Sequence, residues 1–87
     1  MNFIGDIITG EFDQFNDEFV LQQVKQFSTS SILNKDQFNS IYEYLNSHKG
    51  EMDGQVLTLN EQMLVRLSKE EADLFINDLN EIRNFYH

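Results

Sequence analysis

The longest apolar pattern in the chain lies in residues 11–27. Apolar residues recur there at steps of three and four, the period of an amphipathic helix: Phe12, Phe15, Phe19, Val20, Val24 and Phe27. Acidic residues stand near the start of the segment and Lys25 near its end, which suits the helix macrodipole. The spacing predicts a helix over 11–27 whose aromatic stripe packs in the core.

A second helix is expected to begin after Asn34. Asn34 can cap it, and Gln37 three residues later completes a capping box. Its apolar stripe contains Phe38, Ile41, Tyr42 and Leu45, and Gly50 supplies a stop. The serine- and threonine-rich residues 28–31 interrupt the apolar pattern, so we interpret them as a linker.

Residues 55–67 alternate between apolar and polar side chains. Five apolar residues all occupy odd positions, namely Leu57, Leu59, Met63, Val65 and Leu67, and this period of two predicts a β-hairpin that turns at Asn60 and Glu61. A competing interpretation is a helix from Asn60 onward, opened by Thr58 with Glu61 as its capping box. Because two strands alone are marginally stable, the hairpin would have to lie on a helix.

The last helix is expected to start at Ser68, because Ser68 and Glu71 form another capping box. Its core face would carry Ala72, Phe75, Ile76, Leu79, Ile82 and Tyr86. A different face would carry an acidic and apolar stripe of Leu74, Asp78, Glu81 and Phe85.

These elements predict an α+β fold that is mainly helical, with three main helices packed with a small β-hairpin at about 55–67. An all-α bundle is the alternative if 60–67 is helical. Residues 1–87 form one small domain, since 87 residues suit a single hydrophobic core.

The charge of the chain is strongly negative, at −9, with 15 acidic and 6 basic residues. So few basic residues cannot form the positive stripe that DNA or RNA binding requires, so we expect no direct nucleic-acid binding. Acidic surfaces are repelled by anionic lipid, and no apolar run is long enough to span a bilayer, so we expect no membrane attachment. The absence of cysteine indicates a cytoplasmic protein.

Candidate catalytic chemistry is sparse. The only imidazoles are His48 and His87, and no motif places either beside a nucleophile. A calcium loop around Asp53 and Gly54 fails, because Val56, Leu57 and Leu59 occupy positions that should carry oxygen ligands. We therefore expect no enzyme activity, no bound metal and no cofactor.

The leading hypothesis is a small acidic protein-binding module that occludes a basic, nucleic-acid-binding surface of a partner protein. Carboxylates spaced along a helix can imitate phosphates, as in inhibitors of the phage or mobile-element type, DNA mimics and anti-CRISPR-like proteins. The predicted partner-binding residues are Glu70, Glu71, Leu74, Asp78, Glu81, Phe85, Asp13 and Asp17. Two alternatives remain: a structural or oligomerisation subunit, including a homodimer through Leu74 and Phe85, and an immunity or antitoxin protein that neutralises a basic toxin.

Overall fold

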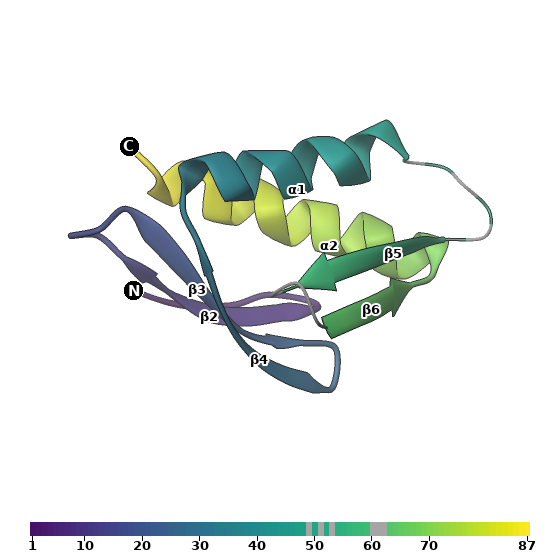
Figure 1. The fold of residues 1–87 in the computed structure, drawn as a ribbon, viewed down its shortest axis with the longest axis horizontal. Coiled ribbons are helices and arrows are strands. Elements are labelled where there is room, and N and C mark those ends of the chain that lie inside the picture. The colour runs from purple at the N-terminus through teal and green to yellow at the C-terminus, as the bar shows by residue number, and fades with distance from the viewer. Residues whose placement is uncertain (49, 51, 53, 60–62) are drawn as a thin grey trace.

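The computed structural model describes residues 1–48, 50, 52, 54–59 and 63–87, and these form two sheets and two α-helices (Figure 1). The elements in chain order are β1 (Asn2–Ile4), β2 (Ile8–Asp13), β3 (Glu18–Val24), β4 (Phe27–Leu33), α1 (Lys35–Ser47), β5 (Gln55–Leu59), β6 (Met63–Leu67), α2 (Lys69–Ile82) and the 3-10 turn η1 (Arg83–Phe85). Strands β1 to β4 form an antiparallel sheet in chain order, and β5 pairs with β6 in a separate antiparallel hairpin.

The mainly helical fold with three main helices is wrong, and so is the all-α alternative. The described residues form a small α+β fold in which a four-stranded sheet occupies the first third of the chain. Both helices lie on the same side of the strands, so the molecule has a helical layer over a β layer (Figure 1). Its extents are 39 × 23 × 23 Å.

The predicted helix over 11–27 is instead the hairpin of β2 and β3, and an irregularity in the strand register explains the error. Phe19 and Leu21 are buried two residues apart, as expected for a strand, but the next buried residue is Val24. The pairing of β3 with β4 shifts register between Leu21 and Gln23. The bulge moves the inward phase by one residue, so Val24 is buried three positions after Leu21, whereas Phe15 and Phe27 of the predicted stripe are exposed.

The serine-rich residues 28–31 are not a linker but most of strand β4. Its neighbour across the turn is β3, where Val24 pairs with Phe27. Lys25 in this turn has a φ of 58°, a left-handed conformation that ends one strand and starts the next. Ser31 is buried, and its hydroxyl lies 2.9 Å from that of Thr29, which satisfies a polar side chain at a core position.

The two later helices begin where the sequence predicts, because both capping boxes form. Asn34 accepts a hydrogen bond from the backbone of Gln37 at 2.8 Å, and the Gln37 side chain accepts one from the Asn34 backbone at 2.9 Å. Ser68 and Glu71 make the same reciprocal pair. Each box satisfies two of the amide groups that a helix start leaves without partners.

The predicted hairpin over 55–67 is also confirmed, with Gln55 opposite Leu67 and Leu59 opposite Met63. The helix starting at Asn60 is therefore wrong, whereas the predicted turn at Asn60 and Glu61 lies outside the described residues. Leu57, Leu59, Val65 and Leu67 are buried, so these four of the predicted positions face the core.

The core combines aliphatic residues from the sheets with rings from both ends of the chain. Phe12 contacts Tyr86 edge-on at 4.9 Å between ring centroids, and Phe38 lies 4.9 Å from the same ring. Phe3 packs against Phe19 at 6.2 Å. These contacts fix the last turn of the chain onto β2 and α1. Within the described residues, neither helix is long and apolar enough to cross a membrane.

Candidate protein-binding surface

Asp78 is not on a solvated face, contrary to the sequence prediction, because its side chain is only 2% exposed. Its carboxylate accepts three backbone hydrogen bonds, two from the loop between β1 and β2 and one from the first residue of β2. Asp6 donates at 3.0 Å to Oδ1, while Ile7 and Ile8 donate to Oδ2 at 2.8 and 3.0 Å. Charge-assisted bonds of this kind hold the loop onto α2. Asp78 therefore joins helix to sheet and is not available to a partner.

The other members of the predicted acidic and apolar stripe do not form one surface with Asp78. Phe85 is half-buried and packs its ring 5.6 Å from Phe12, so it belongs to the core periphery. Leu74 is 38% exposed, and Glu70 and Glu81 are exposed near opposite ends of α2. Because residues eleven positions apart on a helix are separated by about 16 Å, these two carboxylates are too far apart to contact one partner group.

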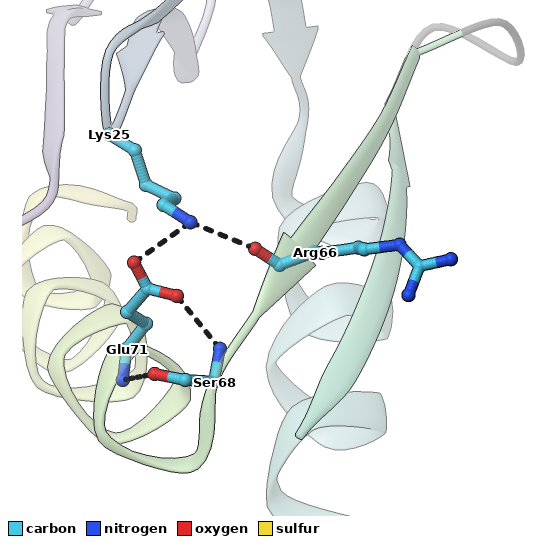
Figure 2. Close-up of polar contacts among 4 residues, drawn as sticks. All are labelled: Lys25, Arg66, Ser68 and Glu71. Carbon is cyan, nitrogen blue, oxygen red and sulfur yellow. Dashed lines mark hydrogen bonds and ion pairs between the residues drawn. The ribbon is translucent and has the colours of Figure 1, made fainter. Parts of the chain in front are cut away.

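Glu71 is occupied by contacts within the molecule (Figure 2). One carboxylate oxygen lies 2.8 Å from Lys25 Nζ, and the other accepts the Ser68 backbone amide at 2.8 Å. The hydrogen bond from Lys25, followed by that from Ser68, lowers the pKa of Glu71. Lys25 also donates to the Arg66 carbonyl at 3.1 Å, so this cluster ties the turn between β3 and β4 to β6 and α2.

A group of four carboxylates lies at the turn between β2 and β3. We call this surface the acidic hairpin tip and define it as Glu11, Asp13, Phe15, Asp17 and Glu18. Asp13 and Asp17 were predicted partner-binding residues, and the antiparallel pairing brings them beside acids of the neighbouring strand: Asp13 stands opposite Glu18. Glu11 is exposed one residue pair further along the same face of β2.

Phe15 is fully exposed at the end of this tip. The turn holding it is well ordered by hydrogen bonds. Asp13 Oδ1 accepts the amides of Phe15 and Asn16 at 3.0 and 3.2 Å, and Asp13 Oδ2 accepts the Asn16 side chain at 2.8 Å. These bonds, led by the Asn16 side chain, lower the pKa of Asp13. The ring borders an open hollow of about 400 Å³ that Glu11, Asp13 and Val20 also line.

The tip is fastened to both ends of the described chain, which lie at the same end of the molecule (Figure 1). The Phe12 amide donates to the Met1 carbonyl at 2.8 Å, and the His87 amide donates to Asp17 Oδ1 at 3.1 Å. Burial raises the pKa of Tyr86, and the nearby carboxylates of Asp17 and Glu18 raise it further. The negative charge at the tip is thus held in place by packing.

Sequence reasoning missed Phe15 as a surface residue, because its spacing from Phe12 and Phe19 matched a helix. A usable signal was present in the pair Asn16 and Asp17, residue types that tolerate the left-handed conformation of tight turns. Asp17 indeed has a φ of 54°. A turn at this pair separates Phe12 and Phe19 onto two strands and leaves Phe15 outside.

The described residues contain no group of three or more His, Asp or Glu side chains arranged to hold a metal ion. The chain matches no protein-family model, no curated protein and no solved structure.

Proposed function

We propose that this protein is an acidic protein-binding module that covers a basic, nucleic-acid-binding surface of a partner through the acidic hairpin tip. The observation that carries the proposal is the fully exposed ring of Phe15, set among carboxylates on an ordered turn. We place its action in the cytoplasm as an inhibitor of the phage or mobile-element type. The physical basis is an apolar anchor, Phe15, surrounded by the negative charge of the carboxylates.

Phe15 supplies what charge alone lacks. An aromatic side chain buries about 150–250 Å² when it enters a pocket, and anchors of this type dominate the energy of many interfaces. The Asp13 hydrogen bonds order the turn before binding, so less conformational entropy is lost when a partner closes over the ring. A matching partner would offer an apolar pocket with Lys or Arg side chains on its rim.

The carboxylates around Phe15 supply direction and rate. Complementary charge raises the association rate and makes it sensitive to salt. Within the described part of the chain, the side chains of Glu11 and Glu18 make no hydrogen bond or ion pair, so they are the acids of the tip that a partner can engage. A surface that normally binds nucleic-acid phosphates is the basic surface that such a group would occupy.

The test is affinity capture from the native source at low salt, with the wild type, Phe15→Ser and the pair Glu11→Lys with Glu18→Lys. The charge-matched control is Glu70→Lys with Glu81→Lys, which alters the same number of exposed acids on α2. We expect one nucleic-acid-binding protein to be retained by the wild type and the control, released by salt, displaced by added DNA or RNA, and lost with both tip variants.

Two results would refute the proposal. If both tip variants retain the same protein as the wild type, the tip is not the binding surface. If the wild type retains only copies of itself in a salt-insensitive dimer, the oligomerisation hypothesis replaces the inhibitor.

A further inference from the structure

A groove runs between α1 and the open edge of β5. Two adjoining hollows of about 530 and 300 Å³ share Ser40, Ile41 and Thr58 as lining residues. At one end the groove reaches Leu33 at the end of β4, and at the other it reaches Tyr44. The groove therefore follows strand β5 along a helix, over about the length of a short extended peptide.

The edge of β5 that faces away from β6 has no strand paired to it among the described residues. In an antiparallel pair, residues that exchange ladder hydrogen bonds alternate with residues whose peptide groups point outward. The peptide groups of Arg66 point outward, away from β5, because its carbonyl oxygen accepts a hydrogen bond from Lys25 Nζ (Figure 2). Its partner is Val56, so Val56 and, two residues on, Thr58 direct their peptide groups to the open edge.

This edge lacks the features that usually keep exposed strands from pairing. Natural edge strands carry charged residues, Pro or bulges, whereas β5 has the sequence QVLTL and pairs with β6 in an unbroken register. Val56 and Tyr44 are each 43% exposed at the groove. An extended segment placed here would gain backbone hydrogen bonds and apolar contacts together.

The charges near the groove indicate which kind of peptide segment it would bind. Among the described residues, none that lines the groove is charged, in a protein of net charge −9. On α1, however, Asp36 and Glu43 are exposed next to Ser40, four residues before it and three after it, on the side of the helix away from Ile41 and Tyr44, so they stand at the outer margin of the groove. Seven helical residues span about 10 Å, close to the length of three strand residues.

We infer that this groove binds an extended peptide segment of another protein by β-strand addition to β5. The segment would have β-branched or small apolar residues at alternate positions, which face Ile41 and Tyr44, and two Lys or Arg residues about three positions apart, which reach Asp36 and Glu43 at the margin of the groove. Strand addition between a helix and a sheet edge obtains affinity from the main chain and specificity from alternate side chains. The inference concerns a different surface from the acidic hairpin tip and does not depend on it.

A second copy of the chain is the less suitable occupant. Two molecules of net charge −9 repel each other, and a second β5 edge brings its own Asp36 and Glu43 against the first pair. A basic segment of another protein meets the same rim with attraction.

The test uses a display library of ten-residue peptides with Lys or Arg fixed at positions 4 and 7, about 10 Å apart in a strand, and the other eight positions varied. Selection is made on the wild type, with removal of peptides that also bind Ser40→Arg. This substitution puts a bulky cation at the groove, and Ser47→Arg on the same helix, outside the groove lining, is the matched control. Circular dichroism confirms that each variant folds.

We expect selected peptides to alternate Val, Ile or Thr with other residues. Binding should weaken at least about tenfold in Ser40→Arg because of like-charge contact, and change little in Ser47→Arg. Amide exchange at Val56 and Thr58 should slow when the peptide binds, which a contact elsewhere would not produce.

Three outcomes would overturn the inference. One is no enrichment over the Ser40→Arg removal step. Another is peptide binding that leaves exchange at Val56 and Thr58 unchanged. The third is protection of these two amides without peptide, accompanied by a doubled mass in solution, because a second copy would then occupy the edge.

Discussion

Removal of the Asp78 carboxylate is the sharpest test of the structure, because the same residue was expected on a binding face. Asp78→Ala leaves the amides of Asp6, Ile7 and Ile8 without their acceptor. Each buried donor that loses its partner costs about 1–3 kcal/mol. The Ile8 bond is fully buried and the other two are partly buried, so a total of about 3–5 kcal/mol is expected. This is a large part of the about 5–15 kcal/mol that stabilises a typical domain.

Asp78→Asn separates the shape of the side chain from its hydrogen bonds. Its single oxygen can replace Oδ2, which accepts two amides, but the amide nitrogen then meets the Asp6 amide donor. We expect a loss of about 2 kcal/mol, smaller than that of the alanine variant. The assay is urea unfolding followed by circular dichroism, with Glu81→Ala as the exposed control, which should change stability by less than about 0.5 kcal/mol.

Gly5 gives an independent check of the same contact. A Cβ atom at Gly5 would overlap all three atoms of the Asp78 carboxylate group. Gly5→Ala should therefore destabilise the wild type and have a clearly smaller effect in the Asp78→Ala background, a coupling that a double-mutant cycle measures. If Asp78→Ala unfolds at the same urea concentration as the wild type, or if Gly5 shows no coupling, the buried position of this carboxylate is refuted.

Three further predictions follow from single side chains. The raised pKa of Tyr86 means that the folded state keeps its phenol neutral, so the free energy of unfolding should fall as the pH rises above about 10. Tyr86→Phe removes the hydrogen bond to the Leu33 carbonyl and should lower the free energy of unfolding by about 1 kcal/mol at neutral pH. In thermal scans the variant should also lose less stability at alkaline pH than the wild type. The lowered pKa of Glu71 gives stability at neutral pH that disappears as the pH falls through the carboxylate range. Glu71→Gln should lower the free energy of unfolding by about 0.5 kcal/mol or less at pH 7, because the pair with Lys25 is solvent-screened, and should be as stable as the wild type in acid. A stability difference that is the same at both pH values would contradict the ion pair. Phe15→Ser should unfold within about 0.5 kcal/mol of the wild type, since a larger loss would mean that the ring packs in the fold.

Local signals explain most of what could be predicted about the fold. The helix starts at Asn34 and Ser68 were correct because a capping box involves only four consecutive residues. The hairpin over 55–67 was correct because its alternation is unbroken by any bulge. The first third of the chain failed where the bulge at Leu21 and Gln23 changed the phase of the buried positions.

The candidate site could be predicted only in part, because exposure depends on contacts between distant segments. Asp13 and Asp17 do lie at a surface turn, whereas Asp78 is buried by a loop about 70 positions earlier in the chain. The predicted last helix placed Phe85 outside its core face. In the structure Phe85 packs on Phe12 of β2, a strand that was predicted as helix. Helical periodicity sorts residues into faces without showing what covers each face.

The sequence by itself determined the negative charge, the absence of cysteine, both helix starts and the inward face of the β5 and β6 hairpin, since each depends on composition or on neighbours within a few residues. Only the tertiary structure decided which apolar and acidic residues meet solvent. It buried Asp78 under the backbone amides of a distant loop and left Phe15 exposed among carboxylates. The physical reason is that burial depends on contacts between segments that are distant in the chain. The turn between β2 and β3 reverses the chain direction and thereby decides which side chains near it are covered.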